Sequence, residues 1–210
     1  MSIKKKIIIT GGLGYIGTEL CKLYSGVSWH HKIVVIDNRF ISERVNQLRN
    51  WNMDFIQGDI LNKDLIKQHC ENADIVHHLA GITDVPRTKN ESSNSQDEKI
   101  REVGEKGTQN ILDVISNKCK IIFPSTHVVF EGIQDVKTDI DESEVTKPVL
   151  SYSSSKAVNE KQLKSSGKNY VILRLGSVYG YSTDSMRTDI MPNLFSKIAS
   201  QNGTLKLFAG

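Results

Sequence analysis

The sequence predicts an α/β fold with a doubly wound parallel sheet, and three observations lead to this prediction. Short runs rich in isoleucine and valine recur along the chain, amphipathic stretches separate them, and a glycine-rich turn follows the first run. Short continuous apolar runs are typical of strands that are covered on both faces. Strands that alternate with helices are typical of a parallel sheet.

The expected elements follow from these patterns in chain order. The chain has 210 residues, which is enough for one substantial α/β domain. Three stretches with apolar residues at helical spacing are predicted helices, at residues 14–24, 103–115 and 152–163. Six apolar runs are predicted strands, at residues 6–10, 32–37, 54–57, 74–79, 119–123 and 170–175.

Two polar stretches interrupt this alternation. Residues 84–99 are interpreted as a mobile surface loop, and residues 131–147, which are rich in Asp and Glu, as a second loop. Two interpretations stay open for both. They are solvated connections, or they border the mouth of an active site, as long loops in α/β folds often do.

The composition excludes several classes of protein. With 38% hydrophobic residues, 24% charged residues and 4 prolines, the chain is neither disordered nor collagen-like nor a disulfide miniprotein. No apolar run approaches the roughly 20 residues of a membrane span, so no membrane partner is expected. The 27 basic and 24 acidic residues are interspersed, so no nucleic-acid surface is expected. Three cysteines without metal-ligand spacing indicate reduced thiols, a cytoplasmic protein and no metal site.

A glycine loop follows the first predicted strand. Gly11, Gly14 and Gly17 stand three residues apart, between that strand and a predicted helix. The first glycine permits a tight turn, the second lets the backbone approach a pyrophosphate, and the third lets the helix pack against the sheet. Asp37 ends the second strand, where a carboxylate accepts hydrogen bonds from an adenosine ribose. This carboxylate favours NAD over NADP, although Arg39 is close enough to accommodate a 2′-phosphate.

Tyr152 and Lys156 form a second constellation. Four residues apart on a predicted helix, they share one face. An unperturbed tyrosine has a pKa of about 10, and lowering it by about three units requires roughly 4 kcal/mol. One positive charge about 4 Å away contributes energy of that order at an effective dielectric constant of about 20. Lys156, helped by a positively charged nicotinamide, is therefore expected to make Tyr152 a usable base.

Hydroxyl side chains follow the fifth predicted strand. Ser125 and Thr126 lie at the carboxyl end of a parallel strand, where ligand clefts form. One of them is expected to hydrogen-bond a reacting hydroxyl or carbonyl group, and the alternative is a hydroxyl that satisfies a local turn. Nothing in the sequence orients His127, His77 or His78 toward a ligand, so these histidines are interpreted as structural.

Together, these motifs resemble those of the extended short-chain dehydrogenase/reductases, in the NAD-dependent epimerase/dehydratase family of nucleotide-sugar enzymes. The resemblance implies a Rossmann fold and covers nearly the whole chain. The motifs are specific for the family and poorly specific for the substrate. The matching segments, in family order, are residues 10–17, 37–38, 58–60, 78–81, 107–112, 125–126, 152–156, 173–175 and 178–180.

The resemblance implies a role for each matching residue. Tyr152 would be the base, Lys156 its partner and a ligand of the nicotinamide ribose, and Thr126 the contact to the substrate hydroxyl. Ser177 stands where the family usually has an asparagine that helps to hold the phosphates of the sugar nucleotide. The implied NAD-binding residues are Gly11, Gly14, Tyr15, Ile16 and Gly17 at the pyrophosphate, Asp37 and Asn38 at the ribose, Asp59 and Ile60 at the adenine, and Leu79, Ala80 and Gly81 along the cofactor floor, together with Tyr152 and Lys156.

The sequence departs from the family pattern near the predicted catalytic residues. Gly104, like Ser177, replaces a usual asparagine. Sugar-nucleotide dehydratases carry Asp-Glu after the catalytic threonine, whereas His127 and Val128 follow it here, which argues against dehydration. Residues 125–132 also resemble the 4-keto-sugar reductases of deoxysugar pathways.

The end of the chain is a further departure, because family members continue well past residue 210. Residues 1–175 are interpreted as an NAD-binding domain that carries the catalytic pair. Residues 176–210 are interpreted as the start of a substrate-binding region that is apparently truncated. Exposed apolar surface is therefore expected near the C-terminus.

Three functions remain in order of preference. The first is an NAD-dependent 4-epimerase of a UDP-, GDP- or dTDP-linked sugar, in which Tyr152 removes the C4 hydroxyl proton and a 4-keto sugar rotates in the pocket. The second is an NAD(P)-dependent reductase or dehydrogenase of a keto-sugar nucleotide or a small alcohol. The third is a non-catalytic, dinucleotide-binding regulatory subunit. The missing C-terminal region, Gly104 and Ser177 favour it, and the intact Thr126, Tyr152 and Lys156 oppose it. The resemblance also implies a homodimer.

Overall fold

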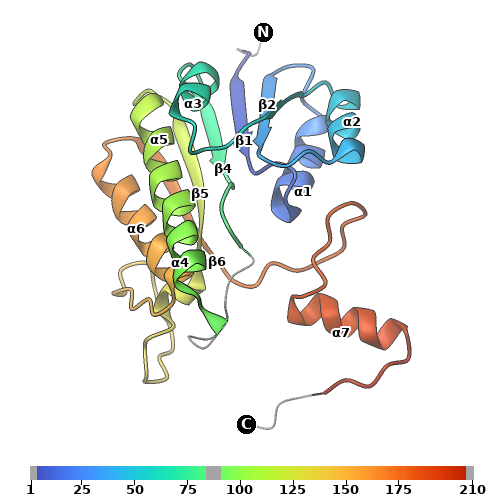
Figure 1. Cartoon of the computed structure of the whole chain (residues 1–210), viewed down its shortest axis with the longest axis vertical. Helices are drawn as coiled ribbons and strands as arrows, with labels where there is room; N and C mark the ends of the chain where they lie inside the picture. The colour runs from blue at the N-terminus through green and yellow to red at the C-terminus, as the bar shows by residue number, and fades with distance from the viewer. Residues whose placement is uncertain (1–3, 84–90, 207–210) are drawn as a thin grey trace.

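The sheet has six parallel strands, in the order β3-β2-β1-β4-β5-β6 (Figure 1). The computed structural model describes residues 4–83 and 91–206. The chain moves outward from β1 to β3 and then returns to the other side of β1 as β4, so the strand order reverses between β1 and β4. Ligands of open α/β sheets bind at the carboxyl ends of the strands beside such a reversal. The strands are β1 (Lys6–Thr10), β2 (Lys32–Asp37), β3 (Asp54–Gln57), β4 (Ile75–His78), β5 (Lys120–Thr126) and β6 (Asn169–Leu175).

Helices cover both faces of this sheet. One face carries the first two helices, and the opposite face carries the third, fifth and sixth (Figure 1). A π-helical turn, η2 (Glu102–Lys106), joins the fourth helix to the fifth, and a 3-10 turn, η3 (His127–Phe130), follows β5. The helices are α1 (Tyr15–Ser25), α2 (Ser42–Asn50), α3 (Lys63–Cys70), α4 (Asn94–Arg101), α5 (Gly107–Val114), α6 (Ser151–Ser165) and α7 (Met191–Ser200).

Two apolar clusters hold the layers together. Successive strand residues point to opposite faces, so Ile8 enters the cluster under α3, α5 and α6, whereas Ile9 enters the cluster under α1 and α2. Both side chains are completely buried. Each such side chain contributes about 1.5–3 kcal/mol to folding, so the two clusters fix the sheet from which the site residues project.

The predicted fold class is confirmed. The strands predicted at residues 6–10, 32–37 and 54–57 agree with β1, β2 and β3, and the strand predicted at residues 170–175 agrees with β6 apart from one added residue. The predicted strand at residues 74–79 is shorter than expected and spans Ile75–His78. The strand predicted at residues 119–123 runs on to Thr126, because the end of β5 pairs with β6 up to Leu175.

The loop predicted at residues 84–99 is wrong from Asn94 onward, where α4 begins. The Ser93 side chain caps this helix by accepting a hydrogen bond from the Gln96 backbone N–H (3.4 Å). Only Ile100 of α4 is buried, so the sequence lacks an apolar pattern there. Residues 84–90 of the same prediction lie outside the described residues. The second polar stretch, residues 131–147, contains no helix or strand, as predicted.

Part of the chain after β6 presents apolar side chains to solvent, as expected. Tyr179, Tyr181 and Met191 are 65%, 80% and 61% exposed. None of the helices in residues 4–83 and 91–206 has the length and apolar character needed to cross a membrane. The three cysteines, Cys21, Cys70 and Cys119, are buried and free.

Candidate active site

The glycine loop lies at the carboxyl end of β1, where backbone segments approach one another closely. Gly11 has φ +70°, and a Cβ there would lie 2.7 Å from the Ala80 backbone nitrogen. A Cβ at Gly17 would lie 2.3 Å from the Gly11 carbonyl oxygen. Only glycine fits both positions without moving the backbone. The loop therefore packs against the end of β4 and lets α1 start close to the sheet.

The start of α1 is open toward a ligand. Its N-cap is Gly14, and no side chain caps the helix. The first N–H groups of a helix have no partner within the helix, and with the helix dipole they favour an anion such as a pyrophosphate. Tyr15 and Ile16, the two other predicted residues in this turn, differ in their contacts. The Tyr15 hydroxyl donates to the Gly180 carbonyl (2.6 Å), whereas Ile16 is 37% exposed.

The predicted ribose ligand, Asp37, ends β2 beside this loop. The carboxylate is almost completely buried and accepts hydrogen bonds from the Leu13 N–H (3.0 Å) and the Arg39 N–H (3.0 Å). The predicted adenosine residues lie nearby, because the Asn38 amide donates to the Asp59 carboxylate (3.4 Å). Ile60 differs from the others, since its side chain is buried in the core.

The predicted cofactor floor follows β4. The Leu79 N–H donates to the Thr10 carbonyl (3.1 Å), and the Ala80 N–H donates to the Thr10 hydroxyl (3.2 Å). His78 hydrogen-bonds the Thr10 hydroxyl (2.9 Å) and the Thr108 hydroxyl (3.0 Å), which joins β1, β4 and α5. Burial, with a smaller effect of nearby Lys156, lowers the pKa of His78 to about 3. His78 is therefore neutral at pH 7 and holds the floor in place, as the structural interpretation expects.

Tyr152 and Lys156 lie on α6, on the other side of this floor. A small cavity of about 20 Å³ is lined by both side chains together with Ala80 and Gly81. The Lys156 ammonium donates to the Pro124 carbonyl (2.8 Å) and lies 5.8 Å from the centroid of the Tyr152 ring. The fold thus brings the predicted catalytic pair and the predicted cofactor floor together.

The electrostatics of this pair differ from the expectation. Burial raises the pKa of Tyr152, and the opposing positive charge is that of Arg187 rather than that of Lys156. The Lys156 ammonium is turned toward the Pro124 carbonyl and the ring of Phe123, whose centroid is 4.4 Å away. Desolvation lowers the pKa of Lys156 to about 8. In the described geometry, Lys156 therefore does not produce the lowered tyrosine pKa predicted from the spacing.

The two candidate hydroxyl groups at the end of β5 have different partners. Ser125 donates to the buried carboxylate of Glu160 (2.6 Å), so this hydroxyl is occupied. The Thr126 hydroxyl accepts a hydrogen bond from the Val128 N–H (3.3 Å) and caps η3. The exposed His127 ring lies 3.1 Å from the Leu175 carbonyl oxygen. Thr126 thus keeps its hydroxyl proton for a further partner, although it also has the local role that was the alternative.

Comparison with known proteins decides the family. The model of the NAD dependent epimerase/dehydratase family matches residues 7–209. The chain belongs to this NAD-dependent epimerase/dehydratase family. The chain is 32% identical over 197 residues to the dTDP-D-glucose 4,6-dehydratase of Dictyostelium discoideum, covering 84% of this chain and 44% of that protein. It is 28% identical over 215 residues to the UDP-N-acetyl-alpha-D-glucosaminuronate decarboxylase of a Bacillus cytotoxicus strain, covering 98% of this chain and 64% of that protein.

Solved structures of nucleotide-sugar epimerases show the same fold. The UDP-glucuronic acid 4-epimerase of Bacillus cereus, in complex with UDP-glucuronic acid and NAD, superposes with a TM-score of 0.77 at 26% identity. The match covers 97% of this chain and 66% of that one. The chain thus spans between 44% and 66% of the length of these relatives. The chain also matches a UDP-glucose 4-epimerase of Neisseria meningitidis and a dTDP-4-dehydrorhamnose reductase of Aggregatibacter actinomycetemcomitans, so similarity to these proteins does not decide the reaction.

The described residues fit the dinucleotide of an NAD-dependent epimerase/dehydratase. The open start of α1 and the tight glycine loop form a cradle for a pyrophosphate. Asp37 lies at the end of β2 beside this loop, where a ribose is expected to bind. Ser177 is less well placed, since it is exposed and takes part in none of the hydrogen bonds of the described residues. The part of the chain that holds the dinucleotide is therefore better defined than the part that would hold a sugar phosphate.

Three charged residues near the pair escaped the sequence analysis. Glu131 accepts hydrogen bonds from the Val149 and Leu150 N–H groups (both 2.7 Å) and so fixes the start of α6. Glu160 fixes the middle of the same helix to the strands. Arg187, which influences Tyr152, comes from the segment after β6. Their partners are distant in sequence, so local spacing carries no signal for them, except that Glu131 lies in the polar stretch considered as a border of the site.

The segment after β6 is attached to α1. The Ser182 hydroxyl donates to the Glu19 carboxylate, and the Tyr15 hydroxyl bonds Gly180 as described above. Arg44 of α2 donates both to the Leu13 carbonyl of the glycine loop and to the Asp184 carbonyl. These contacts hold residues 180–185 beside the start of α1.

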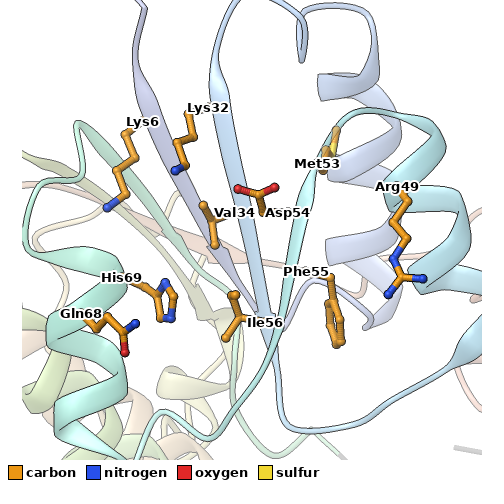
Figure 2. A pocket seen from close by; sticks show the side chains of 10 residues that line it. All are labelled: Lys6, Lys32, Val34, Arg49, Met53, Asp54, Phe55, Ile56, Gln68 and His69. Carbon is orange, nitrogen blue, oxygen red and sulfur yellow. The ribbon is translucent and has the colours of Figure 1, made fainter.

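A larger cavity, of about 460 Å³, lies away from this site (Figure 2). Lys6, Lys32 and Asp54, which start β1, β2 and β3, line it together with His69 of α3 and Arg49 of α2. The cavity is therefore at the amino ends of the strands, whereas the glycine loop and the catalytic pair are at the carboxyl ends. Its charges are mixed, because Asp54 lies among the basic side chains (Figure 2).

Proposed function

We propose that the chain is the dinucleotide-binding and catalytic part of an NAD-dependent nucleotide-sugar 4-epimerase. The observation that carries the proposal is the cavity that places Tyr152 and Lys156 against Ala80 and Gly81, beside the glycine loop. Support comes from the family of this chain and from the UDP-glucuronic acid 4-epimerase with NAD, whose fold this chain shares. When bound, NAD would supply a reversible acceptor for the hydride of the sugar carbon.

In this mechanism the residues of the chain move a proton and orient the sugar. The Tyr152 hydroxyl would, once deprotonated, take the proton of the C4 hydroxyl and later return it. The Thr126 hydroxyl would donate a hydrogen bond to the same sugar oxygen. Because burial raises the pKa of Tyr152 despite the opposing charge of Arg187, the base requires further positive charge, which a bound nicotinamide would supply. The Lys156 ammonium, anchored on the Pro124 carbonyl, would hold the nicotinamide ribose.

The surroundings of the site argue against dehydration. A 4,6-dehydratase needs acidic and basic groups after the threonine, and here His127 faces the Leu175 carbonyl instead. Reduction of a keto-sugar nucleotide stays the second candidate, because a dTDP-4-dehydrorhamnose reductase is among the relatives and residues 125–132 resemble such enzymes. We also propose that residues 1–175 form the NAD-binding domain and residues 176–210 the start of the sugar-nucleotide region. The working form would be a cytoplasmic homodimer.

The test is the conversion of UDP-glucose and UDP-glucuronic acid to their C4 epimers by the purified chain. We expect Tyr152→Phe to remove most turnover while NAD binding persists. Tyr170→Phe, on a 37% exposed tyrosine near the amino end of β6 and away from the site, is the matched control and should have no effect. Normal turnover by Tyr152→Phe would refute the mechanism. Net formation or consumption of NADH in proportion to product would favour the reductase.

A further inference from the structure

The carboxylate of Asp37, the predicted ribose ligand, is hydrogen-bonded within the protein on both oxygens. Oδ1 accepts from the Arg39 N–H (3.0 Å) and the Arg39 Nε (3.2 Å), and Oδ2 accepts from the Leu13 N–H (3.0 Å) and the Arg39 Nη2 (3.4 Å). A carboxylate favours a ribose hydroxyl group and repels a 2′-phosphate because it carries a free negative charge. Here the guanidinium of Arg39 offsets that negative charge.

Arg39 is accessible, unlike its partner. The Arg39 side chain is 55% exposed, whereas that of Asp37 is 4% exposed. The guanidinium therefore forms the outer surface of the pair, and a ligand that approaches the end of β2 meets the arginine before the carboxylate. An exposed arginine offers donors in a fork that matches the oxygens of a phosphate.

The position of Arg39 relative to the glycine loop is also informative. Its Nη2 lies 3.8 Å from the place of a Cβ on Gly14, the N-cap of α1. The guanidinium thus lies between the pyrophosphate cradle and the ribose carboxylate. Arg44 is close by, since burial and the charge of Arg39 both lower its pKa. The Arg44 donors are occupied by the Leu13 and Asp184 carbonyl groups, so Arg39 is the arginine that can turn to a ligand.

We propose that Arg39 makes this site accept a 2′-phosphate, so that the chain binds NADP as well as NAD. On binding of NADP, the guanidinium would exchange part of its contact with Asp37 for the phosphate, and Asp37 would keep its bonds to the Leu13 and Arg39 N–H groups. On binding of NAD, Asp37 would receive the ribose hydroxyl groups. The inference concerns the dinucleotide alone and does not depend on which sugar nucleotide is the substrate.

The test compares the dissociation constants of NAD and NADP by calorimetric titration of the purified chain, after removal of any nucleotide bound during purification. We expect the wild-type constants to agree within tenfold. Arg39→Ala should weaken NADP at least tenfold relative to NAD, which corresponds to about 1.4 kcal/mol. Arg49→Ala, an exposed arginine on α2 away from the loop, should leave the ratio of the two constants unchanged.

Two results would overturn the inference. One is a wild-type protein that binds NADP more than tenfold more weakly than NAD, and the other is an Arg39→Ala variant with an unchanged ratio. Arg39→Gln, which keeps most of the side-chain stem, is the second variant if alanine impairs folding. Retained NAD affinity shows that each variant is folded. Because no sugar is present, a failed epimerase assay and a failed NADP titration are separate outcomes.

Discussion

Replacing Glu160 by alanine tests how α6, and with it the catalytic pair, is attached to the sheet. The Glu160 carboxylate accepts hydrogen bonds from Ser125 (2.6 Å) and from Arg174 through Nε (3.0 Å) and Nη2 (2.7 Å). The two charged side chains are only 4% and 16% exposed. Removing one partner of a buried ion pair costs about 3–5 kcal/mol, because the other charge is left without compensation. Since Arg174 keeps some contact with water, we expect a loss at the lower end, about 3 kcal/mol.

The assay is urea unfolding of the wild-type chain and of matched variants. Lys164→Ala removes a weaker, exposed contact to the same carboxylate, 3.9 Å away, and should cost at most about 0.5 kcal/mol. The double variant Glu160→Ala/Arg174→Ala should be less destabilised than the sum of the two single variants, because neither charge is then left alone. A loss below 1 kcal/mol for Glu160→Ala, or strict additivity with Arg174→Ala, would refute this account.

The same pair gives a pH dependence with a defined sign. Burial alone would raise the pKa of Glu160, but the hydrogen bonds from Arg174 and Ser125 outweigh it and lower the pKa. The stabilisation is therefore complete above the unfolded value of about 4.3 and is lost as the pH falls through the lower folded value. The stability difference between wild type and Glu160→Gln should accordingly shrink below about pH 4.

Two further predictions concern the glycine loop and the thiols. Gly17→Ala should destabilise the chain by about 1–3 kcal/mol in urea unfolding and weaken NAD binding, since its Cβ would lie 2.3 Å from the Gly11 carbonyl oxygen. Gly26→Ala, where a Cβ meets nothing closer than 4.0 Å, is the control and should be neutral or stabilising; equal losses in both variants would contradict the packing argument. The thiols should react slowly with a thiol-specific reagent at pH 8 in the folded chain and rapidly in denaturant, because burial raises their pKa values. Fast reaction in the folded protein would contradict their burial. These values are about 12 for Cys21, about 12 for Cys70 and about 11 for Cys119.

The strands could be predicted from the sequence because their apolar runs are continuous, and the sheet covers both of their faces. Helices with a small buried face could not be found in this way. Only Val45 and Leu48 of α2 and only Ile66 and Cys70 of α3 are buried, so neither helix was predicted. The helix α7 was missed for the same reason, as most of its side chains are exposed and Asn193 is its single buried residue. For α2 and α3, tertiary contacts rather than periodicity decide the structure.

The candidate site was predictable where chemistry depends on local spacing. The glycine loop, Asp37 and the Tyr152–Lys156 pair follow from short motifs, and the fold brings all of them to the carboxyl ends of the strands. The electrostatics were not predictable in this way. The Lys156 ammonium turns to the Pro124 carbonyl, and Arg187 acts on Tyr152 from another part of the chain. Both effects depend on where β5 ends and where the segment after β6 lies, which no local motif encodes.

The attachment of residues 180–185 to α1 has a thermodynamic consequence. Tyr15, in the first turn after the glycine loop, bonds Gly180, and Arg44 joins Leu13 to Asp184. A ligand that restricts the motion of the glycine loop therefore also restricts that distant segment, and the effect must be reciprocal, since coupling free energies between two sites are equal in both directions. If a sugar nucleotide orders the chain after β6, the affinity for the dinucleotide would rise. Binding of the dinucleotide would then raise the affinity for the sugar nucleotide by the same factor.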